Sequence, residues 1–215
     1  MEPKLQKIKI ERTAHVYTLG ADAHTAEDIW LVFHGYGQLA SRIIRKFDEI
    51  EDRRIHVIAP EGLSKFYFKR NPLILGASWM TKMHREDEIE DYLNYLDQIY
   101  HSLDLRANQN FNVLGFSQGS ATMMRWINHA RPNLGKLVIW AGEFPPDLDY
   151  EMAKSYFKTI SKKYYCLGNR DEFFTSEIFD KMTSFLSKYD LGFQYKHFQG
   201  KHEINRKLLA QIIAE

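Results

Sequence analysis

From residue 29 onward, short continuous apolar runs alternate with longer stretches in which apolar residues recur every three or four positions. The first pattern is typical of strands buried on both faces, and the second is typical of helices that pack by one side. The runs that predict strands are 29–33, 55–59, 111–115, 136–141, 164–167 and 193–198. The stretches that predict helices are 39–51, 85–103, 118–129, 150–160, 173–188 and 203–214.

Strands that alternate with helices in this way indicate a mostly parallel central sheet with helices on both faces. Ahead of this region, residues 7–10 and 15–19 are predicted as two short strands around a turn at Arg12-Thr13, which gives an N-terminal antiparallel hairpin. Residues 61–82 are interrupted by glycine and proline and are expected to be irregular. No repeat or linker is visible, and the length fits one α/β domain spanning 1–215.

The composition is that of a globular protein with a sizeable core, since 44% of the residues are apolar and 27% are charged. The net charge of +1 implies no general attraction to nucleic acid or to an anionic membrane. The first residues lack the apolar segment of a signal peptide, and no run approaches the ~20 apolar residues of a membrane span. A cytoplasmic location without integral membrane association is therefore expected. The single cysteine, Cys166, lies in an apolar run and is expected to be a buried structural thiol.

The pentapeptide Gly115-Phe116-Ser117-Gln118-Gly119 joins a predicted strand to a predicted helix. A serine hydroxyl is a weak nucleophile unless it is exposed, fixed and paired with a base. A tight strand-to-helix elbow supplies the exposure, and glycines on both sides of the serine relieve the crowding that the elbow creates. The alternative is an ordinary turn built from small residues, so other parts of the chain must distinguish the two.

Three further chemically apt segments each follow a predicted strand: His34-Gly35-Tyr36-Gly37, Asp171 and His202. In open parallel sheets, ligand sites form beyond the carboxyl ends of the strands, so these segments are expected to converge with Ser117. The order Ser117, Asp171, His202 is the one associated with the α/β-hydrolase fold.

These positions predict a catalytic triad. His202 would take the Ser117 proton and later protonate the leaving group, while Asp171 would hold the imidazole tautomer and stabilise its cation. The oxyanion of the tetrahedral intermediate needs two donors aimed at it. The expected donors are the backbone N–H of Gln118, at a helix N-terminus, and that of Tyr36, in the glycine-rich turn.

Two side chains of the triad, Asp171 and His202, have competitors in the sequence. Glu172 and Asp180 compete with Asp171, but the first comes one residue later and the second falls in a predicted helix. His197 competes with His202, but it lies inside an alternating strand, where a side chain normally faces the core or a helix. His34 is expected to be structural rather than the base, because strand–His–Gly loops supply the oxyanion donor.

The sequence has no His-Glu-x-x-His motif, no cysteine pair, no Gly-x-x-x-x-Gly-Lys-Ser/Thr loop and no dinucleotide fingerprint. Neither a metal nor a cofactor is therefore expected.

With these segments the chain resembles the phospholipase/carboxylesterase family of small α/β-hydrolases, which includes acyl-protein thioesterases and bacterial carboxylesterases. The matching segments run in family order and are His34-Gly35-Tyr36-Gly37, Ala59-Pro60-Glu61-Gly62, Gly76-Ala77-Ser78-Trp79, Gly115-Phe116-Ser117-Gln118-Gly119, Gly168-Asn169-Arg170-Asp171 and Gly200-Lys201-His202-Glu203-Ile204. The resemblance implies an α/β-hydrolase fold and cofactor-free hydrolysis of carboxylic esters or thioesters by the triad and oxyanion donors named above. Trp79 resembles a family tryptophan near the acyl site, with packing under a loop as the alternative.

The chain also departs from the family pattern. Ser120 stands where the family usually has a second glycine, no aspartate closely follows Trp79, and residues 64–82 differ from the well-known thioesterases. As a hypothesis, this stretch forms a flap over the acyl pocket, with Lys69 or Arg70 attracting an acidic leaving group; a surface loop folded onto the core is the alternative. These departures leave the substrate open.

A serine peptidase, a lactone hydrolase and a catalytically silent hydrolase-like binding protein remain alternatives, since a fold does not fix the acyl group. The expected partner is a small-molecule acyl ester or thioester. A homodimer through exposed aromatic side chains is compatible with the sequence, which does not demonstrate one.

Overall fold

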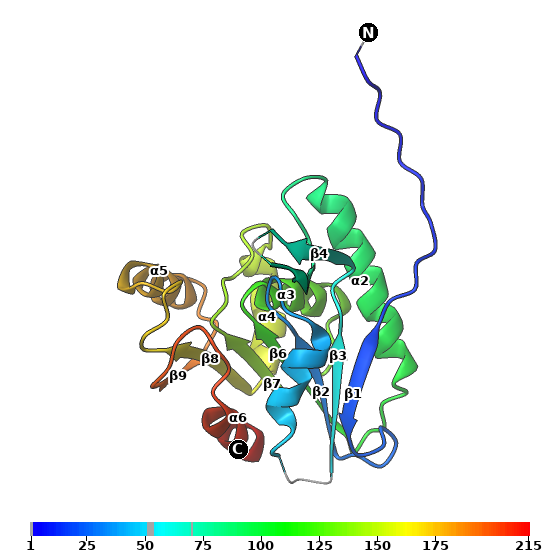
Figure 1. Ribbon diagram of the computed structural model, residues 1–215. Helices are drawn as coiled ribbons and strands as arrows, with labels where there is room; N and C mark the ends of the chain where they lie inside the picture. Colours follow the sequence, from blue (N-terminus) through cyan, green and yellow to red (C-terminus); the bar gives the residue numbers. More distant parts are fainter. Residues whose placement is uncertain (1, 51–53, 70) are drawn as a thin grey trace.

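The computed structural model describes residues 2–50, 54–69 and 71–215. A seven-stranded sheet lies at its centre, with the strand order β1-β3-β2-β6-β7-β8-β9 (Figure 1). The strands from β3 to β9 in this order run parallel, and β1 pairs antiparallel with β3 at the edge. The strands of this sheet are β1 Val16–Gly20, β2 Asp28–Phe33, β3 Ile55–Pro60, β6 Asn110–Phe116, β7 Lys136–Trp140, β8 Lys162–Gly168 and β9 Gln194–Phe198.

Helices cover both faces of the sheet, with α1, the short 3₁₀ helix η1 and α6 on one face and α2 to α5 on the other (Figure 1). The helices are α1 Ala40–Ile43, η1 Ile44–Phe47, α2 Arg85–Ser102, α3 Gln118–Ala130, α4 Tyr150–Thr159, α5 Ser176–Lys188 and α6 Arg206–Ala214. Successive strand residues point to opposite faces, so each strand contributes to two cores. In β2, for example, Leu31 packs in the core under α2 to α5, whereas Trp30 and Val32 pack in the core under α1 and α6.

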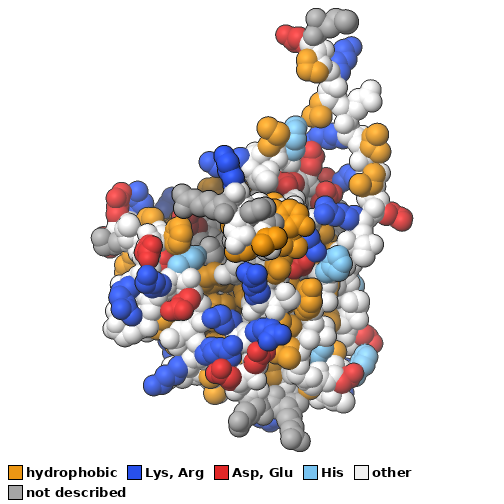
Figure 2. Space-filling view, in the orientation of Figure 1, with side chains coloured by type: hydrophobic (Ala, Val, Ile, Leu, Met, Phe, Trp, Pro, Cys, Tyr) orange, Lys and Arg blue, Asp and Glu red, His pale blue; other side chains and the backbone are white. Residues whose placement is uncertain are grey.

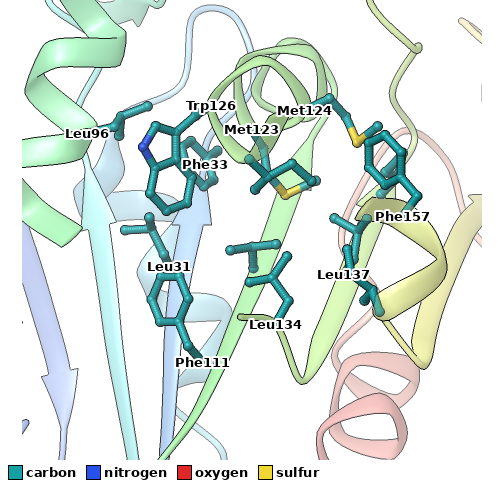
Figure 3. Close-up of a cluster of buried hydrophobic side chains, with 14 of the residues drawn as sticks. Leu31, Phe33, Leu96, Phe111, Met123, Met124, Trp126, Leu134, Leu137 and Phe157 are labelled. Atoms are coloured by element: carbon teal, nitrogen blue, oxygen red, sulfur yellow. The ribbon is translucent and has the colours of Figure 1, made fainter. Parts of the chain in front are cut away.

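The larger core fills the space between the sheet and helices α2, α3 and α4 (Figure 3). Leu31 and Phe111 reach it from neighbouring strands, and Met123 and Trp126 reach it from α3; all four side chains are at most 2% exposed. Ser117 lies between the end of β6 and the start of α3, so the packing of α3 on the sheet fixes the position of Ser117.

The predicted strands and helices from residue 29 onward are present, with bounds that differ by a few residues, and Cys166 is buried as expected. The helix expected over 39–51 is shorter, because α1 and η1 end at Phe47 and its expected end at Glu51 lies outside the described residues. No helix in the described ranges has the length and apolar character needed to cross a membrane.

The prediction of a strand at residues 7–10 is wrong. Residues 2–13 are exposed and extended, with Ile8 at 82% and Ile10 at 80% exposure, and Lys7 and Lys9 make ion pairs with α2. Two apolar residues offer too little surface to hold a strand in place. Strand β1 instead takes its antiparallel partner from β3, so the N-terminal region contributes one strand to the sheet and not a hairpin.

The antiparallel hairpin of the fold lies at 64–78, in the stretch that was wrongly expected to be irregular. It consists of β4 Ser64–Phe68 and β5 Asn71–Ser78, with a register shift between Tyr67 and Phe68. The burial of β4 alternates, since Phe66 and Phe68 are half-buried and Tyr67 is 68% exposed. Pro72 sits near the start of β5, where a missing N–H is tolerated, so the proline does not prevent the strand.

Candidate active site

Four loops meet at the carboxyl edge of the parallel strands. The loop after β2 holds His34 to Gln38, Ser117 follows β6, Asp171 lies three residues beyond β8, and His202 lies four residues beyond β9. Parallel strands end at the same edge, so residues far apart in the sequence come together there. A methyl group in place of a Gly35 hydrogen would lie 3.1 Å from the Ser117 Cβ, which shows how closely two of these loops approach each other.

Ser117 occupies a strained elbow between β6 and α3. Its backbone angles are φ 52° and ψ −121°, a combination that residues with a Cβ rarely adopt. Its N–H donates to the Trp140 carbonyl at 2.9 Å, which ties the elbow to the neighbouring strand β7. Strain of this kind costs about 1–3 kcal/mol and persists where the surrounding structure enforces it, as at active sites.

Close helix–strand packing at the elbow explains its composition. A Cβ on Gly119 would lie 2.4 Å from the Phe33 carbonyl oxygen, so no larger residue fits there. Ser120 is fully buried, and its Oγ donates to the Gly115 carbonyl at 2.7 Å. The serine at the departure from the family pattern is therefore accommodated, and it bonds the start of α3 back to β6.

Asp171 and His202 form a hydrogen-bonded pair. The Asp171 Oδ2 lies 2.8 Å from the His202 Nδ1, and the carboxylate side chain is fully buried while that of His202 is 20% exposed. The other carboxylate oxygen, Oδ1, accepts from the Phe173 N–H at 2.9 Å. These bonds fix the orientation of the imidazole and leave its Nε2 as the outward-facing nitrogen.

Aromatic rings enclose the His202 imidazole. The ring centroid of Phe116, the residue before Ser117, lies 4.9 Å from that of His202, and the Phe173 centroid lies 4.7 Å away. Within the described part of the chain, neither the Ser117 Oγ nor the His202 Nε2 has a hydrogen-bond partner. Serine–histidine hydrogen bonds are often long without substrate and shorten when it binds, so the lack of this bond here is compatible with a Ser117–His202 pair.

The competing residues lie in other settings. The Glu172 carboxylate pairs with Lys201 at 3.2 Å, and Asp180 is exposed on α5. His197 is exposed on β9, where its ring packs against Phe179 with centroids 5.4 Å apart. Asp171 and His202 are the pair that the fold brings together.

His34 is locked in the neutral form beneath the loop. It is fully buried, its Nε2 accepts a hydrogen bond from the Gly62 N–H at 2.9 Å, and its Nδ1 therefore donates to the Gly35 carbonyl at 2.8 Å. Burial disfavours the imidazolium and lowers the pKa of His34. With both nitrogens engaged, His34 acts as a structural brace, as expected from the sequence.

Several backbone groups of the loop from His34 to Gln38 are hydrogen-bonded. The Gly35 N–H donates to the Gln38 Oε1 at 3.1 Å, and the Gly37 N–H donates to the Ala77 carbonyl at 2.8 Å. The N–H groups of Tyr36 and Gln118 have no acceptor in the described ranges. Gln118 is the first residue of α3 and is half-buried, whereas Tyr36 is exposed, so both N–H groups are open to an acceptor from outside the chain.

Trp79 lies under this loop. It is 1% exposed, its Nε1 donates to the His34 carbonyl at 2.8 Å, and its ring stacks on the His34 imidazole with centroids 5.0 Å apart. This position favours the packing role over direct contact with an acyl chain.

Two contributions to the site were not predicted. The Gln118 side chain accepts from the Trp79 N–H at 3.2 Å and donates to the Met80 carbonyl at 3.0 Å, which joins the elbow to the end of the hairpin. Glu61 is buried, and its Oε2 accepts from the Ala40 N–H at 3.2 Å, at the start of α1. The segment Ala59-Pro60-Glu61-Gly62 marked this region in the sequence but indicated no role for it.

No protein-family model matches the sequence, and no curated protein matches it at a significant level. Solved structures, in contrast, match over nearly the whole chain. Acyl-protein thioesterase 2 from Zea mays has a TM-score of 0.69 and 14% identity, and the alignment covers 94% of this chain and 98% of that chain. Esterase PE8 has a TM-score of 0.68 and 16% identity, with 94% and 99% covered.

A phospholipase/carboxylesterase from Dyadobacter fermentans has a TM-score of 0.63 and 15% identity, with 96% of this chain and 99% of that chain covered. Identities this low establish a shared fold and leave the chemistry to the residues of the site. The sheet order, the helices on both faces and these similarities show that the chain has the α/β-hydrolase fold of these thioesterases and carboxylesterases.

Proposed function

We propose that the protein is a serine hydrolase that cleaves carboxylic esters or thioesters through an acyl-enzyme intermediate. The observation that carries the proposal is the buried Asp171 carboxylate, 2.8 Å from the Nδ1 of His202, whose ring packs beside the elbow of Ser117. A fully buried carboxylate bonded to one nitrogen of a partly exposed imidazole is the arrangement that makes an adjacent serine a nucleophile.

In the first half-reaction, the Ser117 Oγ attacks the acyl carbon and its proton moves to the His202 Nε2. The carbonyl π electrons move to the oxygen, which takes a negative charge opposite the N–H groups of Tyr36 and Gln118. Asp171 stabilises the imidazolium without taking its proton. The intermediate then collapses, the bond to the alcohol or thiol breaks, and the leaving group takes the proton from His202.

The second half-reaction repeats these steps with water. His202 removes a proton from water as the hydroxide attacks the acyl-Ser117 carbon, and the same two N–H groups hold the new oxyanion. Collapse releases the carboxylic acid, and the proton returns from His202 to Ser117.

The surroundings of the site support an apolar acyl or alcohol group. The exposed rings of Tyr36 (59%) and Phe173 (66%) flank the site, and Tyr36 stacks on Phe66 with centroids 5.1 Å apart. The names of the similar structures, a thioesterase, an esterase and a phospholipase/carboxylesterase, support an ester or thioester as the substrate.

The proposal is tested by assaying short- and long-chain p-nitrophenyl esters and acyl-CoA with the wild type and with Ser117→Ala. We expect turnover by the wild type and labelling of Ser117 by a fluorophosphonate. Both should be lost in Ser117→Ala, whereas Ser120→Ala, which removes the neighbouring buried hydroxyl, should still be labelled.

Turnover that persists in Ser117→Ala would overturn the mechanism. If the wild type turns over no ester or thioester and takes up no fluorophosphonate, the protein is a hydrolase-like binding protein instead.

A further inference from the structure

The hairpin β4–β5 is attached to the loop that carries the Tyr36 N–H. The Gly37 N–H donates to the Ala77 carbonyl at 2.8 Å, and the Ala77 N–H donates to the Gln38 carbonyl at 3.2 Å. These two bonds make an antiparallel bridge between β5 and the loop. The hairpin is therefore part of the wall of the proposed oxyanion hole.

Phe68 on β4 closes this attachment. Gly37 has φ +73°, and a Cβ placed on it would lie 2.6 Å from the Phe68 Cζ, so the ring lies directly over the Gly37 Cα. A Cβ on Gly76 would lie 2.9 Å from the Phe68 Cε2 and 2.8 Å from the Gly37 carbonyl oxygen. One ring thus fills the space that two glycines leave between the hairpin and the loop.

Phe66 contacts the side chain of Tyr36, the residue before Gly37. It faces the same side of β4 as Phe68, two residues away, and their ring centroids are 5.3 Å apart. Its ring stacks on Tyr36 with an interplanar angle of 26°. Figure 2 shows hydrophobic side chains gathered at this part of the surface, over the hairpin. The two phenylalanines therefore contact both the residue whose N–H is the expected donor and the glycine that follows it.

We propose that Phe68 is a positioning residue that holds the Tyr36 N–H in the orientation that binds the oxyanion. This inference rests on the proposed hydrolase function. Tyr36 lies between two glycines. Their wide backbone freedom would let the loop turn the Gly35–Tyr36 peptide, which carries this N–H, away from the site. The ring over Gly37 blocks that rotation, while the Gly35 side of the loop is held by the Gln38 side chain.

The test compares Phe68→Ala with Tyr67→Ala, a matched control from the same strand. Tyr67 points away from the loop and is 68% exposed, so its removal changes the hairpin without touching Gly37. Loss of a whole oxyanion donor costs about 10²–10³ in kcat, so a loosened donor should lower kcat by about 10–100-fold. We expect this loss in Phe68→Ala with KM changed less than about threefold, and no loss in Tyr67→Ala.

A second measurement separates positioning from general damage. An alkyl boronic acid forms a tetrahedral anionic adduct with an active-site serine, so its affinity reports the oxyanion hole. The affinity of Phe68→Ala for it should fall by the same factor as kcat, while Phe68→Met, which refills the space over Gly37, should recover part of both. Thermal melting of all variants identifies any that fail to fold.

The proposal is overturned if a folded Phe68→Ala retains the wild-type kcat and boronic acid affinity, or if KM alone rises. It is also overturned if Tyr67→Ala loses as much kcat as Phe68→Ala, because the effect would then come from the hairpin as a whole. A wild type that hydrolyses no ester and binds no boronic acid contradicts the proposed function itself, so the two failures are distinguishable.

Discussion

His34 and His202 lie at the same edge of the sheet, each just past a strand, and differ in what their second nitrogen contacts. In His34 both nitrogens are engaged, one with the Gly62 N–H and the other with the Gly35 carbonyl, and the side chain is fully buried. In His202, Nδ1 is bonded to Asp171, Nε2 has no partner among the residues that the structure describes, and the side chain is 20% exposed. One histidine braces a loop, while the other has a second nitrogen that no group in the described ranges occupies.

The difference shows that position past a strand end does not assign a histidine its role. We expect the partner of the second nitrogen to assign it, because an imidazole that must both donate and accept in the interior has no site left for a proton from substrate. The variants described next test this distinction, beginning with the largest expected effect.

His202→Gln should abolish most of the activity and leave the fold intact. Without the imidazole no base accepts the Ser117 proton, so kcat should fall by about 10⁴-fold or more. The melting temperature should change by no more than about 4 °C. Esterase kinetics and thermal melting measure the two effects.

His197→Gln is the matched control, since it removes an exposed imidazole from the adjacent strand. It should retain activity within about twofold. A loss in His197→Gln that equals the loss in His202→Gln would show that the base is assigned to the wrong histidine.

His34→Leu should act on stability first. The change removes two buried hydrogen bonds and leaves the Gly62 N–H without its acceptor, at a cost of about 2–4 kcal/mol in the free energy of unfolding. Urea unfolding measures this, with His24→Leu, on the exposed surface, as the control. A stable His34→Leu with normal kcat would mean that the brace does not hold the loop.

His34 should also make stability depend on pH. Burial lowers its pKa in the folded protein, so below about pH 6.5 the unfolded chain binds a proton that the folded chain does not. The contribution of His34 is therefore complete above that pH and declines as the pH falls, by up to about 1.4 kcal/mol per pH unit.

The measurement is urea unfolding of the wild type and His34→Leu at pH 7.5 and 5.5. The wild type should lose roughly 1 kcal/mol more than the variant between the two pH values. An equal loss in both proteins would show that other groups account for the pH dependence.

The smallest expected effect separates two tryptophans that support these loops. The Trp79 indole N–H donates to the His34 carbonyl, and the Trp140 indole N–H donates to the Glu203 carbonyl, both at 2.8 Å. Replacement of either by Phe should cost about 1 kcal/mol in unfolding free energy. The Trp140 bond lies next to His202. If the Asp171 bond alone orients His202, Trp140→Phe should leave the rate at which fluorophosphonate labels Ser117 unchanged.

The sequence predicts the site edge well because strand and helix periods are strong signals. The apolar runs before His34, Ser117, Asp171 and His202 place all four past strands, and the structure has a strand before each. Their catalytic roles stay predictions until the variants are assayed.

Tertiary contacts decide what the sequence left unpredicted. The strand at 64–68 was missed because Pro72 suggested an irregular stretch, whereas pairing with β5 stabilises it. The strand predicted at 7–10 does not form, and no pairing partner in the described ranges lies beside it. The bracing bonds of His34 and Gln118 join segments far apart in the chain, which no local pattern reports.

The four tryptophans of the chain are all buried, two in each core: Trp79 and Trp126 under α2 to α5, and Trp30 and Trp140 under α1 and α6. Indole emission shifts to longer wavelength when water reaches the ring, so intrinsic fluorescence of this protein samples both faces of the sheet at once. Trp→Phe variants that leave one emitter would resolve which face opens first during unfolding, without any attached dye.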